Sequence, residues 1–193
     1  DKAGWATIDC QFLIDLPDEV GTRVMIYLLR SIGGRPYPPR RKRLLRAISM
    51  IKKPEIPTAF TLGGCKVSQL GSKLMFLREE WPQTPPLTNL EAGSVKWRGV
   101  FLCEFETVSD GSSQVLFLAP LGQKGWEQVV QESPEIKKSG MLHAVALTLP
   151  ALFGGNRVLM VPHMNYCYKD DYASENRPNL RFVAANFLPL EER

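Results

Sequence analysis

Two stretches near the start of the chain repeat apolar residues at the spacing of an α-helix. The first begins at Pro17-Asp18 and ends at the glycine pair 33–34, which permits the left-handed conformation of a helix end. The second begins at Arg40. The apolar positions predicted to face a core are Val20, Val24, Tyr27, Leu28 and Ile32 in the first stretch, and Leu44, Leu45, Ile48 and Ile51 in the second. The short connection between the stretches predicts a helical hairpin.

The apolar pattern changes after the second helix to that of β-strands. Residues 60–70 and 72–78 are predicted to pair across a turn at Gly71-Ser72, with a bulge at Gly63-Gly64 in the first strand. Residues 5–16 alternate loosely, which fits either a short strand or an extended lead-in. Residues 1–80 are therefore predicted to form a small helical unit that ends in a β-hairpin.

Strand patterns predominate in the second half of the chain. The Pro-rich residues 81–93 have no periodicity and predict a semi-rigid linker. The elements predicted beyond it are strands at 94–108 and 114–121 joined across a turn at 109–112, a helix at 125–133, a hairpin at 150–161 and a strand at 180–187. Residues 136–147 are ambiguous, with a second short helix as one interpretation. The fold class is therefore α+β, with residues 94–193 as a mixed, strand-rich C-terminal domain.

Positive charge is concentrated in residues 31–53, which hold eight Lys and Arg and no acid. Residues 1–80 contain 14 Lys and Arg against 8 Asp and Glu, whereas residues 81–193 contain 10 against 12. On the second helix, the cations are predicted to lie opposite the apolar stripe. An ordinary solvated face mixes both signs of charge, so a purely positive face favours an anionic partner such as phosphate. A solvated face without a ligand remains an alternative, as does an interface with acids of another domain or a second copy.

The sequence contains no pattern that we would assign to catalysis. His143 and His163 lack a carboxylate at metal-ligand spacing, and neither belongs to a recognisable nucleophile–base pair. A deep pocket around either histidine would revive the hypothesis of an independent enzyme. The acidic residues Asp170, Asp171 and Glu175 are interpreted as a solvated loop. The four cysteines are widely scattered, which favours free thiols in a reducing cytoplasm. No stretch has the ~20 apolar residues of a membrane span, so a binding module without metal is expected.

Several short motifs, in order along residues 10–165, resemble one protein family. They are LLR at 28–30, GGRPYPPRRKRLLRAI at 33–48, FTLGGCKVSQLGSKLMFLRE at 60–79, APLGQKGW at 119–126 and LTLPALFGGNRVLMVP at 147–162. This arrangement is similar to the bacterial tRNA(Ile)-lysidine synthetases (synthases), in the region C-terminal to the ATP-binding catalytic domain. The family's Ser-Gly-Gly-x-Asp-Ser loop, which grips ATP, does not occur here. Together with the start at Asp1, this leads us to expect a piece of a longer protein.

The resemblance implies an activity for the parent enzyme and a role for this piece. The parent uses ATP and Mg²⁺ to join lysine to the wobble cytidine of the CAU-anticodon isoleucine tRNA, which changes codon reading from Met to Ile. The implied partners of this piece are isoleucine tRNA and the N-terminal catalytic domain. Without the ATP loop, the piece alone is expected to bind no cofactor and to be inactive. A cytoplasmic location without membrane contact is expected.

Charge pattern and resemblance together give a set of candidate RNA contacts. Backbone phosphates and 2′-hydroxyls dominate the recognition of A-form RNA, which suits a row of cations on a rigid helix. The residues predicted to bind phosphates are Arg35, Arg40, Arg41, Lys42, Arg43, Arg46 and Lys53. Candidate contacts on the acceptor side are Lys96, Arg98, Lys137 and Lys138. Tyr37 is predicted either to stack on a base or sugar or to pack on its own turn.

Overall fold

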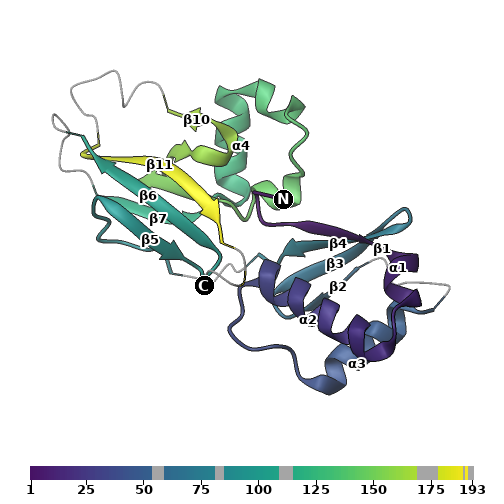
Figure 1. The fold of residues 1–193 in the computed structure, drawn as a ribbon. Coiled ribbons are helices and arrows are strands. Elements are labelled where there is room, and N and C mark those ends of the chain that lie inside the picture. Colours follow the sequence, from purple (N-terminus) through teal and green to yellow (C-terminus); the bar gives the residue numbers. More distant parts are fainter. Residues whose placement is uncertain (54–58, 81–84, 109–114, 169–177, 189, 191–193) are drawn as a thin grey trace. The chain divides into compact units, whose positions relative to one another are not determined.

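The protein combines helices with antiparallel sheets in two compact units (Figure 1). The computed structural model describes residues 1–53, 59–80, 85–108, 115–168, 178–188 and 190. The first unit contains Asp1–Glu79, Arg98–Val100 and Leu188–Arg193, and the second contains Glu80–Trp97 and Phe101–Phe187. The predicted α+β fold class is confirmed.

The first unit is built on a four-stranded antiparallel sheet in the order β1-β4-β3-β2. Its strands are β1 Ala6–Asp9, β2 Ala59–Leu62, β3 Cys65–Leu70 and β4 Lys73–Arg78. Its helices are α1 Cys10–Asp15, α2 Asp18–Gly33 and α3 Arg41–Ile51. Helices α2 and α3 lie on the same face of the sheet (Figure 1). The predicted helical hairpin is therefore confirmed, and so is the turn at Gly71-Ser72.

Three expectations about the strands of this unit need correction. Gly63-Gly64 is not a bulge but the two-residue turn between β2 and β3, with φ of +61° and +82°. Two consecutive positive φ angles suit a tight hairpin turn, and glycine adopts them without steric cost. In residues 5–16 the predicted alternative of a short strand is confirmed by β1, which pairs with β4, but the short helix α1 that follows it was not predicted. The unit therefore contains a full sheet rather than a single hairpin.

The buried faces of the two long helices differ from the predicted stripes. In α2, Gly21, Met25, Leu29 and Ile32 are buried, whereas the predicted Val20 and Tyr27 are 43% and 46% exposed. In α3, Leu44, Ala47 and Ile51 are buried, and the predicted Leu45 is 47% exposed. The prediction selected the largest apolar side chains. The buried face instead includes two small residues, Gly21, whose nearest neighbours are Leu13 and Leu16, and Ala47.

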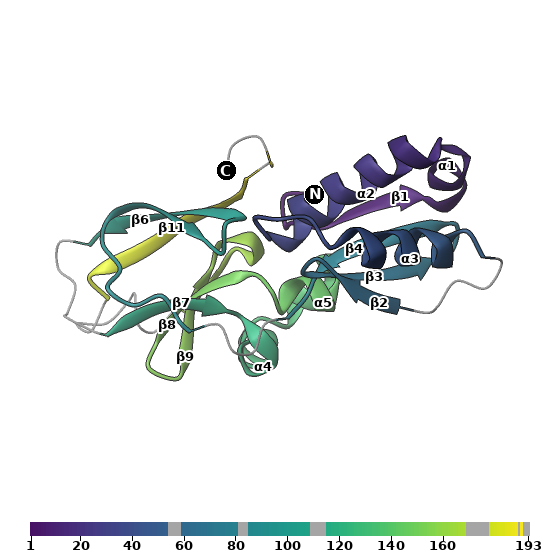
Figure 2. The same cartoon turned by 90° about the horizontal axis from the view of Figure 1, so that it is seen from below.

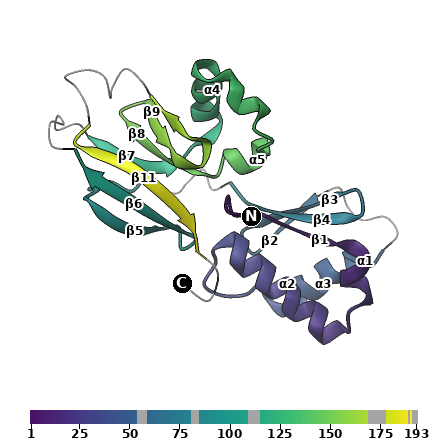
Figure 3. The same ribbon diagram turned by 45° about the horizontal axis from the view of Figure 1, so that its top comes forward.

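The second unit contains two antiparallel sheets, seen one over the other in Figure 2. One has the order β11-β6-β5 and is made of β5 Gly93–Trp97, β6 Phe101–Thr107 and β11 Leu180–Phe187. The other has the order β10-β9-β8-β7 and is made of β7 Leu116–Pro120, β8 Pro150–Gly154, β9 Arg157–Val161 and β10 Tyr166–Cys167. The helical segments are α4 Gly122–Glu132 and α5 His143–Ala146, both labelled in Figure 3, and the 3₁₀ segments η1 Pro134–Lys138 and η2 Pro162–Met164.

Part of the predicted second half is confirmed and part is wrong. The hairpin at 150–161, the last strand and the helix near 125–133 are present, and residues 136–147 hold two short helical segments. Residues 94–108 are not one strand, because the chain reverses between β5 and β6 at a turn where Arg98 has φ +53° and Gly99 has φ +65°. Strands β6 and β7 lie in different sheets, so they do not form the predicted hairpin. The turn predicted at 109–112 lies outside the described residues.

The predicted linker is described from residue 85 onward. Leu87 donates a hydrogen bond to the Leu118 carbonyl of β7 and accepts one from the Leu118 amide, each at 2.9 Å. These bonds attach this part of the segment to the second unit.

The four cysteines are free thiols. Cys10, Cys65 and Cys103 are buried, and burial raises the pKa of the Cys65 and Cys103 thiols to about 12. Both thiols are therefore protonated and unreactive at neutral pH. Among the helices of the described segments, none is long and apolar enough to cross a membrane.

Candidate nucleic-acid interface

Helix α3 separates its apolar residues from its charged ones. Burial of Leu44, Ala47 and Ile51 fixes the helix against the first unit. The side chains that this orientation leaves in solvent are the basic face, which we define as Arg40, Arg41, Lys42, Arg43 and Arg46. Lys53 follows the helix and is also exposed. The predicted separation of charge from packing is therefore present, although Leu45 lies among the exposed residues.

The beginning of α3 is electrostatically unfavourable without a ligand. Its first turn contains no acid, and Arg40 at the N-cap makes no side-chain capping bond. Three cations follow directly, at the helix end where the dipole is positive. Among the described residues, ion pairs join Arg23 to Glu19 and Lys52 to Asp18, and the basic face takes part in neither. Binding of an anion would therefore relieve repulsion at this helix end.

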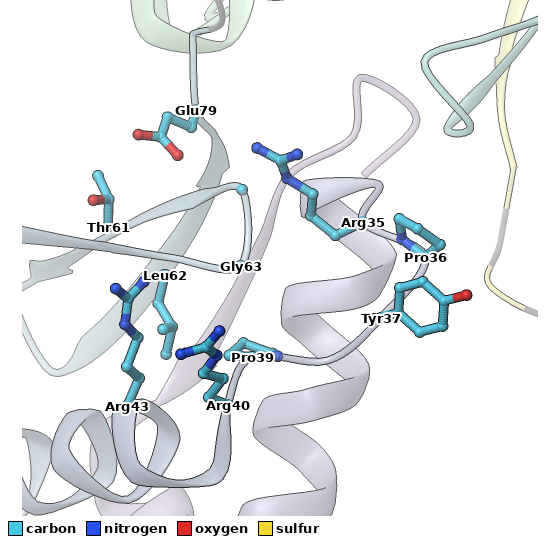
Figure 4. A pocket seen from close by; sticks show the side chains of 11 residues that line it. Arg35, Pro36, Tyr37, Pro39, Arg40, Arg43, Thr61, Leu62, Gly63 and Glu79 are labelled. Carbon is cyan, nitrogen blue, oxygen red and sulfur yellow. The ribbon is translucent and has the colours of Figure 1, made fainter.

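An open pocket of about 630 Å³ lies beside the start of α3 (Figure 4). The residues around it come from the connection between α2 and α3, the first turn of α3, and the β2–β3 turn. Arg40 and Arg43 extend into it from α3, and the Arg35 side chain extends toward Glu79 (Figure 4). Thus three predicted phosphate contacts line one pocket together with Tyr37.

A close contact between two backbones positions the β2–β3 turn, whose Gly63 and Gly64 line this pocket. A Cβ atom on Gly33, near the end of α2, would lie 2.1 Å from the Gly63 carbonyl oxygen, so only glycine fits there. Gly34 then ends the helix with φ +68°, and its amide donates to the Arg30 carbonyl at 3.2 Å. The Gly64 carbonyl accepts a hydrogen bond from the Glu79 amide at 2.8 Å. The double-glycine helix end and the double-glycine turn are therefore packed against each other.

Sequence reasoning missed several residues of this site. The Arg30 guanidinium donates to the Pro36 carbonyl at 3.2 Å, which holds the connection that carries Tyr37. Thr61 and Glu79 line the pocket from the sheet. Arg30 and Glu79 both fall within the motifs shared with the resembled family, and that was the available signal. Tyr37 is 80% exposed, so solvent surrounds most of its ring.

Lys52, one of the eight cations of residues 31–53, is paired within the unit. Its ammonium lies 2.6 Å from a carboxylate oxygen of Asp18, and this hydrogen bond lowers the pKa of Asp18. We expect Lys52→Ala to raise the pKa of Asp18 toward its ordinary value, and Lys53→Ala to leave it unchanged. Because the folded pKa is depressed, the pair stabilises the fold above the ordinary Asp pKa and is lost as pH falls through the folded value. Carboxyl NMR titration measures both variants. An unchanged Asp18 titration in Lys52→Ala would contradict the assignment.

The four candidate acceptor-side contacts are divided between the units. Lys96 on β5 and Lys137 and Lys138 in η1 are exposed in the second unit. Arg98 belongs to the first unit, where it is half-buried, and burial lowers its pKa to about 10. It therefore stays charged at neutral pH. No observation tests a contact of these residues with RNA, so they stay predictions.

The histidines are packed against aromatic rings. The His143 ring lies 5.2 Å from the Trp126 ring, and the His163 ring lies 5.3 Å from the Phe101 ring in a T-shaped arrangement. Neither histidine lines the pocket of the first unit. Within the described ranges, no group of three or more His, Cys, Asp and Glu side chains is placed to hold a metal ion. The acidic cluster predicted at Asp170, Asp171 and Glu175 lies outside the described residues.

Comparison with curated proteins identifies relatives along most of the chain, although no family model matches it. The chain is 29% identical over 147 residues to the tRNA(Ile)-lysidine synthase of Ruegeria pomeroyi. The aligned part is 76% of this chain and 32% of that protein. It is 26% identical over 165 residues to the tRNA(Ile)-lysidine synthase of Wolbachia pipientis wMel, and the aligned part is 84% of this chain and 36% of that protein. A third such synthase, from the Wolbachia of Brugia malayi, is 23% identical over 169 residues, and the aligned part is 86% of this chain and 37% of that protein.

These matches confirm the resemblance that the short motifs predicted. The chain spans about a third of the length of the curated relatives it matches. It is therefore homologous to one region of the tRNA(Ile)-lysidine synthases.

Proposed function

We propose that this chain is the tRNA-binding region of a tRNA(Ile)-lysidine synthase, on the C-terminal side of its catalytic domain. The observation that carries the proposal is the basic face, five exposed cations that form no ion pair with a described acid. RNA supplies a regularly charged backbone, and a rigid helix holds the cations at fixed spacing along it. Lys53 extends the same surface, and Arg35 adds a cation at the adjoining pocket.

The proposed parent enzyme joins lysine to the wobble cytidine of the CAU-anticodon isoleucine tRNA at the expense of ATP. ATP and Mg²⁺ would bind in the catalytic domain, since this chain has no Ser-Gly-Gly-x-Asp-Ser loop. Its described residues also gather no three-ligand metal cluster. The residues present thus do not fit ATP and Mg²⁺, and no step of the reaction is assigned to them. Such an enzyme would act in the cytoplasm with its tRNA substrate.

This region would supply contacts with the tRNA away from the anticodon. A methionine tRNA can carry the same CAU anticodon as the isoleucine tRNA, so the anticodon alone cannot distinguish the two. The basic face would bind the backbone of the tRNA body. Further contacts, toward the acceptor stem, would come from Lys96, Arg98, Lys137 and Lys138. Their charge suits phosphate binding.

The test is binding of this chain to transcripts of the two tRNAs at low salt, measured by fluorescence anisotropy. We expect isoleucine tRNA to bind, and to bind more tightly than methionine tRNA with the same anticodon. The alternative is that the basic face contacts the catalytic domain or a second copy of the chain. Absence of binding to both tRNAs, with the chain folded, would reject the proposal in favour of that interface.

A further inference from the structure

The pocket beside α3 combines cations with an exposed aromatic ring. Arg40 and Arg43 line it from the helix, and Tyr37 lines it from the connection between α2 and α3 (Figure 4). Cations alone are sufficient to follow the phosphates of an A-form duplex. An exposed ring beside them adds binding energy only where a base is unstacked and offers its face. The combination therefore distinguishes a nucleotide outside a duplex from a duplex backbone.

The backbone at Tyr37 is restricted before any ligand binds. Pro36 precedes it, and Pro38 and Pro39 follow it, so the backbone around the ring has few conformations to lose. Arg30 fixes the Pro36 carbonyl through the hydrogen bond at 3.2 Å. With 80% of its surface exposed, the Tyr37 side chain has little protein contact to give up on stacking. Because the backbone that carries the ring is already restricted, stacking on a base costs less backbone entropy.

The charge around the pocket indicates where a phosphate would sit. Arg40 and Arg43 lie at the α3 end, whereas Glu79 lies toward the opposite side in Figure 4. A phosphate would be repelled by the Glu79 carboxylate and attracted to the two arginines. The volume of about 630 Å³ lies within the range of about 300–1,000 Å³ that is usual for sites of small ligands, so one nucleotide fits.

We propose that this pocket binds a single unstacked RNA nucleotide, with its phosphate at Arg40 and Arg43 and its base on the Tyr37 ring. This inference rests on the proposed RNA-binding function and deepens it, because it adds a site for an unpaired nucleotide to a surface for backbone phosphates. The ligand class is therefore single-stranded or bulged RNA rather than continuous duplex.

The test compares a single-stranded hexamer of uridine with a 12-base-pair RNA duplex, both fluorescein-labelled, at low salt. The variants are Tyr37→Leu, Tyr37→Phe and the control Tyr27→Leu, which removes a half-exposed tyrosine of α2 outside the pocket. We expect Tyr37→Leu to weaken hexamer binding roughly 5- to 150-fold, the effect of losing one stacked base. Duplex binding should be unchanged. Tyr37→Phe, which keeps the ring, and Tyr27→Leu should both bind the hexamer like the unmodified chain.

A second readout reports stacking directly. A hexamer with one 2-aminopurine should lose fluorescence on binding to the unmodified chain and to Tyr37→Phe, but not to Tyr37→Leu. Glu79→Gln should tighten hexamer binding, because it removes a negative charge from the pocket. Equal effects of Tyr37→Leu on hexamer and duplex, or no effect on either, would overturn the nucleotide site while the RNA-binding function stands. Failure of the unmodified chain to bind hexamer, duplex and isoleucine tRNA would instead reject both proposals.

Discussion

Replacing Gly33 by alanine is expected to destabilise the first unit by about 3 kcal/mol, at the upper end of the usual cost of overpacking. The new Cβ would lie 2.1 Å from the Gly63 carbonyl oxygen and 3.0 Å from the Gly64 carbonyl carbon. Both atoms belong to the backbone, so no side-chain rotation relieves the clash. The β2–β3 turn must move away from α2, which strains the 2.8 Å hydrogen bond between the Glu79 amide and the Gly64 carbonyl.

Gly21→Ala is the matched control for this clash. Gly21 is also a buried glycine of α2, but a Cβ there would meet its nearest neighbours at 3.7 and 3.8 Å, which is ordinary contact. Alanine is also the better helix former by about 1 kcal/mol, so Gly21→Ala should not destabilise the unit. Urea unfolding, followed through amide NMR signals of residues 59–78, measures both variants. Equal free energies of unfolding for the two would contradict the close contact.

The triple variant Arg40→Ala, Arg43→Ala, Arg46→Ala is expected to weaken binding to isoleucine tRNA by on the order of 100-fold at low salt. Each arginine is proposed to neutralise a phosphate and release its counterions, and the variant removes three such contacts. All three side chains are exposed, and alanine is a strong helix former, so α3 should remain folded. Circular dichroism checks the fold, and fluorescence anisotropy gives the affinity.

A second triple variant separates the basic face from net charge. Arg23→Ala, Lys66→Ala, Lys73→Ala removes the same number of positive charges from exposed positions of the first unit outside the basic face. We expect only a small loss of affinity, because these three cations lie outside the basic face and are not proposed to neutralise a phosphate. A loss equal to that of the first triple variant would mean that tRNA responds to overall charge and not to α3.

The elements with a strong local pattern and the hairpins β3–β4 and β8–β9 could be predicted from the sequence, and the pairing of strands distant in sequence could not. Helix α2 begins and ends at local signals, Pro17-Asp18 and the glycine pair 33–34, and α3 begins where the apolar repeat starts after Arg40. Strand β1 pairs with β4 across more than 60 residues of sequence, and this depends on tertiary packing. The β5–β6 turn at Arg98-Gly99 lacks the usual Asn-Gly or Pro signal, so two strands looked like one.

The candidate site shows the same division between local and long-range information. The exposure of the basic face followed from charge periodicity within one helix. The pocket did not, because it requires the contact between Gly33 and Gly63, which are 30 residues apart in the sequence. The sequence left two alternatives for Tyr37, stacking on a base or sugar and packing on its own turn. Its side chain is 80% exposed, which makes the ring available to a ligand. Glu79 was missed since its role depends on which arginines lie near it in the fold.

The most direct test of the account is the salt dependence of isoleucine tRNA binding. The logarithm of the binding constant is plotted against the logarithm of salt concentration for the unmodified chain and the Arg40, Arg43, Arg46 triple variant. Each lost phosphate contact should reduce the slope by about 0.7–0.9, so the triple variant is predicted to be shallower by about 2–3. Parallel lines for the two proteins, or no binding by the unmodified chain at low salt, would contradict the claim that α3 binds RNA phosphates.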